Sequence, residues 1–167
     1  KVLYDLRSSE IVKEHIESSG GKAVISRVGH SYIKQIMREK DIVFGGELSG
    51  HYYFKDNYFA DSGLIAAVVL ISLMSQKKKK LSELIKPLNK YFQSGEINSI
   101  VKDIKNKLKD IENDYSDGKK LNLDGLSVYY DDWWFNLRPS NTEPLLRLNL
   151  EAKTREKMEE KRDELLK

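Results

Sequence analysis

The sequence predicts an α/β three-layer domain with a mostly parallel sheet, followed by a smaller α+β domain with an antiparallel sheet. In the first half, short apolar runs alternate with segments of helical periodicity, which is typical of a parallel sheet covered on both faces. A lysine-rich break at 76–80 then interrupts the apolar pattern. Beyond it, turn-forming pairs separate runs of alternating polarity, which favours antiparallel strands. We therefore predict two domains, 1–80 and 81–167.

Three strands and three helices are expected in the first domain. The strands lie at 2–4, 23–25 and 42–44, and the helices follow the capping residues Ser8 or Ser9, Ser31, and Asp61 or Ser62. The last helix contains the apolar run Leu64–Met74, which is well short of the ~20 residues that a membrane span needs, so we interpret it as a buried helix. Because α/β sheets bind ligands at the carboxyl ends of their strands, function is expected at that edge.

The second domain is expected to combine two helices with an antiparallel sheet. Apolar residues at helical spacing between Ile97 and Ile111 predict a helix over much of 98–114. A hairpin of 128–130 with 133–137, a strand at 145–151 and a final helix after Thr154 complete the domain. In the strand at 145–151, one face carries Leu146, Leu148 and Leu150, and the other carries Leu145, Arg147, Asn149 and Glu151.

The composition excludes several kinds of site. The chain has no cysteine, so disulfides, thiolate catalysis and cysteine-based zinc sites are ruled out, and a reducing cytoplasmic setting is expected. The formal net charge is only +3, whereas nucleic-acid binding calls for basic residues gathered on one face. Charge alone therefore gives no argument for a nucleic-acid partner.

The polar segment RPSNTEP, Arg138–Pro144, is the first candidate binding site. Arginine carries a planar set of donors that matches phosphate. Ser140, Asn141 and Thr142 add side-chain donors, and small polar residues let backbone amides curl around an anion. An ordinary capped turn with a surface salt bridge explains this composition equally well, so both interpretations stand at this point.

The segment GGELSGH, Gly45–His51, is the second candidate and follows the third predicted strand. In an extended backbone, Glu47, Ser49 and His51 would point the same way. A carboxylate, a hydroxyl and an imidazole on one wall suit the hydroxyl groups of a sugar, and His51 can also move a proton. The alternative is a glycine-rich turn with a satisfied histidine.

The segment SRVGHSYIK, Ser26–Lys34, is the third candidate and follows the second predicted strand. Arg27 and His30 are cationic candidates just before a helix N-terminus, which itself favours anions. A surface arginine with a capping pair is the competing interpretation. Because both strands are expected to be parallel, this segment and Gly45–His51 should lie at the same edge of the sheet.

Taken together, these motifs resemble those of the α-D-phosphohexomutases, the phosphomannomutase/phosphoglucomutase family. The resemblance rests on GGELSGH followed by YYFKDNYFADSG, and on RPSNTEPLLRLNLEA further along the chain. The segments GEINS, at 95–99, and WFNLRPSNTEPLLRL look most like the bacterial and archaeal phosphomannomutases. The resemblance runs over nearly the whole chain.

The resemblance implies a fold and a reaction. The family has four domains around a cleft, and this chain would be the third, an α/β/α domain, and the fourth, a TBP-like α+β domain. The N-terminal domains of the same protein and a hexose phosphate substrate are then the implied partners. The implied activity is an intramolecular phosphotransferase, an isomerase that interconverts hexose 1-phosphate and 6-phosphate through a bisphosphorylated intermediate.

The family's catalytic elements are not found in this chain. A phosphoserine donates the phosphate in the family, and Mg²⁺ held by an aspartate-rich loop assists it. Glucose or mannose bisphosphate is the implied activator. Neither a Ser-His-Asn-Pro loop nor an Asp-Gly-Asp-Gly-Asp-type loop occurs here, so no metal ligand is expected in this chain. This chain alone is expected to bind a substrate and not to turn it over.

The resemblance also assigns roles to residues that match the family motifs. Glu47 and Ser49 match the residues that contact the sugar hydroxyls, His51 matches a histidine for sugar contact or proton transfer, and His30 matches a histidine near the substrate. The loop that holds the non-reacting phosphate corresponds to Arg138, Ser140, Asn141 and Thr142. Arg27 is assigned to the phosphate as well, in a position where many relatives have lysine, and Arg147 is a weaker candidate.

Three alternatives remain open from the sequence. Phosphoglucosamine mutase shares a similar sugar loop, with another residue often at the position of Leu48. A sugar-phosphate-binding protein without catalysis would show the same motifs. A nucleic-acid-binding module would draw on the lysine run at 77–80, but that run lies in the predicted linker and no recognition motif accompanies it.

Overall fold

The computed structural model describes residues 1–140 and 143–167. The chain divides into two compact units, Lys1–Lys90 and Tyr91–Lys167. The sequence placed the boundary ten residues earlier. The intervening segment holds a short helix, α4 (Leu81–Ile85), and a 3₁₀ turn, η2 (Lys86–Leu88), and both group with the first unit.

The first unit is built on a five-stranded sheet, which we call sheet A. Its order is β2-β1-β3-β4-β5, formed by β1 (Val2–Asp5), β2 (Ala23–Ser26), β3 (Phe44–Gly46), β4 (Tyr52–Phe54) and β5 (Ala60–Asp61). β1 pairs in parallel with both β2 and β3 and forms the parallel part of the sheet. β1 and β2 lie where predicted, whereas β3 begins at Phe44, the last residue of the third predicted strand. β4 and β5 add antiparallel pairs, so the sheet is mixed.

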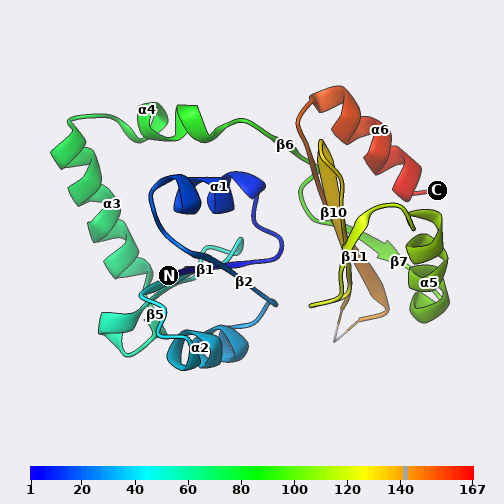
Figure 1. Ribbon diagram of the computed structural model, residues 1–167, viewed down its shortest axis with the longest axis horizontal. Coiled ribbons are helices and arrows are strands. Elements are labelled where there is room, and N and C mark those ends of the chain that lie inside the picture. Colours follow the sequence, from blue (N-terminus) through cyan, green and yellow to red (C-terminus); the bar gives the residue numbers. More distant parts are fainter. Residues whose placement is uncertain (141–142) are drawn as a thin grey trace. The chain divides into compact units, whose positions relative to one another are not determined.

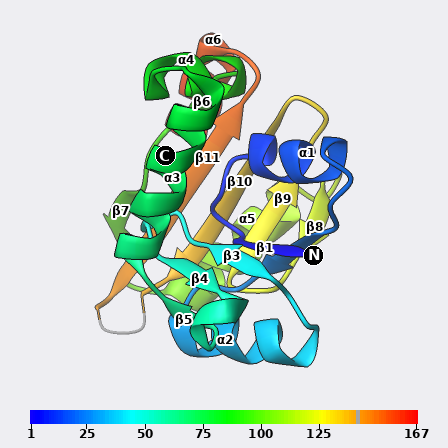
Figure 2. The same cartoon turned by 90° about the vertical axis from the view of Figure 1, so that its left-hand side faces the viewer.

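Two helices cover the two faces of sheet A. α1 (Glu10–Ser18) lies on one face and α2 (His30–Glu39) on the other, as Figures 1 and 2 show. The Ser9 hydroxyl accepts a hydrogen bond from the Ile11 backbone N–H and caps α1 as predicted. α2 begins one residue before the predicted cap Ser31, with Gly29 at the N-cap position. The three-layer arrangement of this unit is therefore confirmed.

The apolar core of the first unit lies between sheet A and α2. It is formed by Leu3, Ile33, Met37, Ile42 and Tyr53, all of them fully or almost fully buried. The i, i+4 spacing of Ile33 and Met37 places both side chains on the face of α2 that meets the sheet. This core fixes the parallel strands whose ends carry the candidate site.

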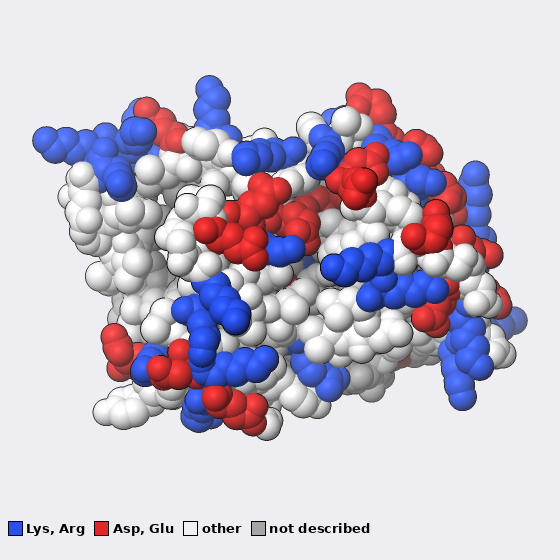
Figure 3. Space-filling view, viewed as in Figure 1, with Lys and Arg blue, Asp and Glu red and all other residues white. Residues whose placement is uncertain are grey.

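The apolar helix α3 (Gly63–Lys77) differs from its predicted environment. Ser62 caps it as expected, since its hydroxyl accepts from the Ile65 backbone N–H, but no residue of the helix is buried. Its apolar side chains run around the whole circumference, so no single face could bury them all. In Figure 3 the helix forms a stretch free of charged side chains at the left of the view. No helix of the described residues is long and apolar enough to cross a membrane.

Replacing Val68 and Ile71 of α3 by serine is expected to reduce self-association without destabilising the fold. Both side chains are exposed, at 58% and 64%, and lie one turn apart. Each substitution should change the free energy of unfolding by less than about 0.5 kcal/mol. Light scattering and urea denaturation measure the two effects. The matched core variant Ile33→Ala should lose about 2–5 kcal/mol, and an equal loss in the α3 variant would show that α3 is packed after all.

The second unit is built on a six-stranded antiparallel sheet, which we call sheet B. Its strands are β6 (Phe92–Gln93), β7 (Ile97–Ile100), β8 (Lys119–Leu121), β9 (Leu126–Tyr129), β10 (Trp133–Pro139) and β11 (Leu145–Ala152). They run in the order β6-β11-β10-β9-β8, and β7 also pairs with β11. The helices are α5 (Ile104–Asp114) and α6 (Arg155–Leu165). The hairpin around Asp131-Asp132, the strand after Pro144 and the final helix are confirmed.

The predicted helix over 98–114 is wrong in its first part. Ile97–Ile100 is strand β7, which pairs with β11, and α5 begins only after Asp103, whose carboxylate accepts from the Asn106 backbone N–H. In β7, Ile97 and Ser99 are half-buried while the alternate residues are exposed. This alternation has the period of a strand, and pairing with β11 overrides the helical spacing of the isoleucines.

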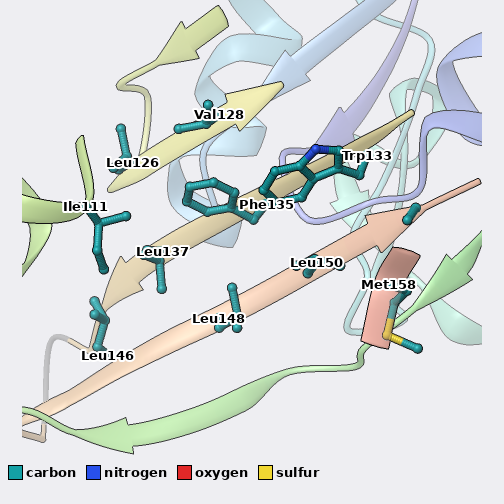
Figure 4. Close-up of a cluster of buried hydrophobic side chains, with 11 residues drawn as sticks. Ile111, Leu126, Val128, Trp133, Phe135, Leu137, Leu146, Leu148, Leu150 and Met158 are labelled. Carbon is teal, nitrogen blue, oxygen red and sulfur yellow. The ribbon is translucent and has the colours of Figure 1, made fainter. Parts of the chain in front are cut away.

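The two faces of sheet B differ in chemistry, and both are buried. The apolar face forms the core shown in Figure 4, which is made of Ile111, Leu126, Val128, Trp133, Phe135, Leu137, Leu146, Leu148, Leu150, Ala152 and Met158. The opposite face of β10 and β11 is polar. There the Trp134 indole N–H donates to Glu151 at 3.0 Å, and the Asn136 amide donates to the Ser127 hydroxyl at 3.0 Å. The polar alternation predicted for 145–151 therefore holds, and it places Arg147 on this face.

Candidate functional site

The carboxyl ends of β1, β2 and β3 meet at one edge of sheet A, which we call the strand-end edge. Asp5 lies opposite Ser26, and Tyr4 lies opposite Gly46, so the three parallel strands end side by side. The loops that begin at Arg27 and at Glu47 therefore leave the sheet at the same edge, as predicted. The middle strand β1 adds a third loop between them, which the sequence analysis did not single out.

The GGELSGH segment forms a tight turn and not an extended wall. The Glu47 backbone N–H donates to the His51 carbonyl at 2.9 Å, and the Gly50 N–H donates to the Glu47 carbonyl at 3.0 Å. Gly50 has φ +83°, a conformation that glycine adopts without strain. The expectation that Glu47, Ser49 and His51 point the same way is therefore wrong, because the chain reverses direction between β3 and β4.

The turn separates these three side chains into a buried part and an exposed part. Glu47 is buried, whereas Ser49 and His51 are exposed. A hydrogen bond of 2.9 Å joins the Ser49 hydroxyl to Nδ1 of His51. Because this contact engages Nδ1, a ligand or a reacting proton would meet Nε2 of His51.

Glu47 belongs to a buried ionic cluster with Asp5, Arg7 and Tyr53. The Arg7 guanidinium lies 2.7 Å from the Asp5 carboxylate and 3.9 Å from that of Glu47. The Tyr53 hydroxyl donates a short hydrogen bond to Glu47. Burial of Tyr53, together with this carboxylate partner, raises the pKa of Tyr53 above its ordinary value, so the phenol stays protonated as a donor. The cluster therefore holds the Glu47 carboxylate in one place.

Asp5 connects this cluster to the turn. Its side chain is fully buried at the end of β1, and it accepts hydrogen bonds from the Arg7 backbone N–H at 2.8 Å and from the Leu48 backbone N–H at 2.9 Å. The Asp5 carboxylate thus holds both the Arg7 guanidinium and the backbone of Leu48 in the turn. The sequence signal for this cluster is a charged pair, Asp5 and Arg7, directly at the carboxyl end of an apolar strand.

Arg27 and His30 lie at the same edge but in different surroundings. Arg27 stacks on the Tyr32 ring, with its guanidinium carbon 4.0 Å from the ring centroid. His30 is the first residue of α2 and is exposed. The stacking orients the Arg27 guanidinium across an aromatic face. The structure thus places both residues at the strand-end edge.

In the second unit, two arginines lie directly opposite each other on neighbouring strands. Arg138 of β10 pairs with Arg147 of β11, on the polar face of sheet B. The Glu96 carboxylate lies between them, 3.7 Å from an Arg138 nitrogen and 3.4 Å from an Arg147 nitrogen. Arg147 also donates to the Ser140 hydroxyl at 3.3 Å. We call these four residues the Arg138 cluster.

The loop after β10 is only partly described. The Ser140 backbone N–H donates to the Leu145 carbonyl at 2.8 Å and closes the base of the loop. This amide is therefore committed to the loop itself. Asn141 and Thr142, which were also assigned to phosphate binding, lie outside the described residues.

The chemistry of the two sites is complementary. The Arg138 cluster offers two guanidinium groups and a hydroxyl, a donor set that suits a phosphate or a carboxylate. The strand-end edge offers a buried carboxylate, a hydroxyl and an imidazole, which suit sugar hydroxyls. Within the described part of the chain, no group of three or more histidine, aspartate or glutamate side chains could hold a metal ion.

Two family models match the chain in succession. Residues 1–91 match the α/β/α domain III of phosphoglucomutase/phosphomannomutase, and residues 96–167 match the C-terminal domain of the same proteins. The two matches fall on the two compact units of the structure.

Curated relatives and a solved structure agree with these matches. The chain is 52% identical to a phosphomannomutase of Methanocaldococcus jannaschii, over 99% of this chain and 37% of the relative. It is 41% identical to a protein of Xanthomonas campestris named phosphohexose mutases, over 92% of this chain and 35% of that relative. A crystal structure of a phosphoglucomutase/phosphomannomutase family protein from Burkholderia thailandensis superposes with a TM-score of 0.82 and 28% identity, covering 97% of this chain and 35% of the other.

The chain thus spans little more than a third of the length of these relatives. The resemblance noted from GGELSGH and RPSNTEP is confirmed by matches that cover both units. This chain belongs to the phosphoglucomutase/phosphomannomutase family, of which it carries domain III and the C-terminal domain.

Proposed function

We propose that this chain binds a hexose phosphate, with the Arg138 cluster as the phosphate anchor and the strand-end edge as the reader of the sugar hydroxyls. The observation that carries the proposal is the pair Arg138 and Arg147, which lie opposite each other and share one carboxylate. Two neighbouring guanidinium groups in a partly buried environment stabilise an anion between them, and in this structure that anion is the Glu96 carboxylate.

The sugar part of the proposal rests on the cluster around Glu47. Its carboxylate is held by Tyr53 and Arg7 and can accept further hydrogen bonds, since an ionised carboxylate has about four acceptor positions. Ser49 and His51 lie exposed on the same turn, and Arg27 and His30 lie at the same edge of the sheet. These groups provide both acceptors and donors for a ring that carries several hydroxyls.

In a longer protein that supplies a phosphoserine and an aspartate-rich Mg²⁺ loop, this binding would serve the interconversion of hexose 1-phosphate and 6-phosphate. The described residues offer no metal site, so no step through a metal is assigned to this chain. The contribution of the Arg138 cluster would be to hold the phosphate that does not react and so to orient the other end of the sugar. His51 is the candidate for proton transfer at the sugar.

Replacing Glu47 by glutamine tests the division of labour between phosphate and sugar. We expect the affinity for mannose 1-phosphate to fall roughly 3- to 10-fold, as for a lost hydrogen bond. The affinity for inorganic phosphate should not change, because the Arg138 cluster is intact. Isothermal titration calorimetry on the 167-residue chain gives both numbers. The control Glu39→Gln removes the same charge from the exposed side of α2.

Two outcomes would redirect the proposal. If Glu47→Gln lowered the affinity for inorganic phosphate as much as the affinity for mannose 1-phosphate, the assignment of Glu47 to the sugar hydroxyls would be wrong. If the unmodified chain preferred glucosamine 1-phosphate over mannose and glucose 1-phosphate, the phosphoglucosamine mutase alternative would replace the phosphomannomutase/phosphoglucomutase assignment.

A further inference from the structure

Glu96 occupies the place between the two arginines that an anionic ligand would take. Its two carboxylate oxygens face different partners, Oε2 toward Arg138 at 3.7 Å and Oε1 toward Arg147 at 3.4 Å. Strong charge-assisted hydrogen bonds are about 2.7–2.9 Å long, so both contacts are loose. The Glu96 side chain is 28% exposed and is not packed into a core.

The backbone around Glu96 is fixed by the strand that follows it. Gly95, with φ +70°, turns the chain just before β7, and Asn98 of β7 lies opposite Arg147 in β11. The strand pairing therefore keeps the Glu96 backbone beside the arginines. The side chain can leave the guanidinium groups by rotation about its own bonds, without unpairing a strand.

We propose that Glu96 is a built-in competitor of the phosphate, which neutralises Arg138 and Arg147 when no ligand is bound and is displaced when a phosphate enters. This inference rests on the proposed function, since it assumes that the Arg138 cluster is the phosphate anchor. A carboxylate and a phosphate make the same paired contacts with guanidinium, but a phosphate dianion has more charge and more acceptor oxygens. Phosphate therefore displaces Glu96 from the two arginines, and the net free energy of binding is reduced by the contacts that Glu96 loses.

The consequence of this competition is a phosphate that binds less tightly and leaves faster. Without Glu96, two like charges would face each other across β10 and β11, and a phosphate would relieve their repulsion in full. With Glu96 present, its carboxylate already reduces the repulsion between the two arginines before any phosphate binds. Because differences in affinity at one site appear mainly in the dissociation rate, Glu96 would speed release.

Replacing Glu96 by glutamine tests the sign of this effect. We expect inorganic phosphate to bind about 3- to 10-fold more tightly, because two loose ion pairs no longer have to be broken. Without phosphate the variant should melt at a lower temperature than the unmodified chain. Saturating phosphate should raise the melting temperature of the variant by more than it raises that of the unmodified chain. Calorimetry and circular dichroism measure these effects. The control is Glu156→Gln, which removes the same charge from an exposed residue in the first turn of α6.

The outcomes separate this inference from the proposed function. If Glu96→Gln bound phosphate with unchanged or lower affinity, Glu96 would be a structural support of the arginines and the competitor role would be overturned. Equally tighter phosphate binding in Glu156→Gln would show that the effect comes from net charge alone, and the competitor role would be overturned as well. If Arg138→Ala left phosphate binding unchanged, the anchor itself would be wrong, and the proposed function would fall together with the inference.

Discussion

Replacing Arg138 by alanine is expected to weaken the binding of mannose 1-phosphate and of inorganic phosphate by roughly 10- to 150-fold. This range follows from the about 1.5–3 kcal/mol that a hydrogen bond to a charged group contributes. Arg138 lies on a central strand of sheet B, with Arg147 opposite and Glu96 at 3.7 Å. After the substitution Glu96 can pair fully with Arg147, so the remaining cation is less available to the ligand.

The measurement is calorimetry with each ligand on the unmodified and substituted chains. Arg162→Ala is the matched control, because Arg162 is a partly exposed arginine of α6 that pairs with Asp163. It should leave both affinities unchanged. The far-ultraviolet circular dichroism spectrum should stay the same in both variants. Equal affinities for Arg138→Ala and the unmodified chain would show that Arg138 does not bind the phosphate.

Replacing Asp5 by alanine is expected to lower the stability of the first unit by about 3–5 kcal/mol. The substitution leaves the largely buried Arg7 guanidinium without its nearest carboxylate, at 2.7 Å, and the Leu48 N–H without its acceptor. The lost ion pair and the lost hydrogen bond both belong to the buried cluster at the strand-end edge. The Glu47–His51 turn should loosen as well, because Asp5 is its link to β1.

Amide hydrogen exchange resolves this effect within the chain. Exchange at β1 and β2 should accelerate strongly in Asp5→Ala, whereas the two tryptophans, Trp133 and Trp134, report by fluorescence that the second unit stays folded. Lys55→Ala is the control, since Lys55 pairs with Asp41 in an exposed ion pair and its loss should leave exchange in β1 unchanged. Protection of β1 at the level of the unmodified chain would mean that the Asp5–Arg7 pair contributes little.

The elements that the sequence predicted well are those whose local pattern and tertiary environment agree. The strands β1 and β2, the caps at Ser9 and Ser62 and the alternation in β11 all follow from local rules. β7 was missed because its isoleucines fit a helix as well as a strand, and only the pairing with β11 decides between them. α3 was placed correctly in the chain, but the sequence does not say what surrounds it.

The candidate sites show the same limit. The motifs pointed to Glu47, Ser49, His51 and Arg138, but the spacing of the first three in the chain did not reveal that a turn sends Glu47 inward and the others outward. Asp5 and Arg7 form a local pair, but their link to the Glu47–His51 turn comes from contacts with Leu48 and Glu47, about forty residues away. Glu96 was missed for the same kind of reason. Glu96, for instance, meets Arg147, which follows it by fifty-one residues. Such contacts are set by strand register and not by local sequence.

The most direct test of the account is a nuclear magnetic resonance titration of the isotope-labelled 167-residue chain with mannose 1-phosphate. We predict saturable shifts of the backbone amides of Arg138, Ser140 and Arg147, and of those of Leu48 and His51. Inorganic phosphate should shift only the first three. Shifts confined to the lysines at 77–80, or no saturable shift at either group, would contradict the claim that this chain is a hexose phosphate-binding protein.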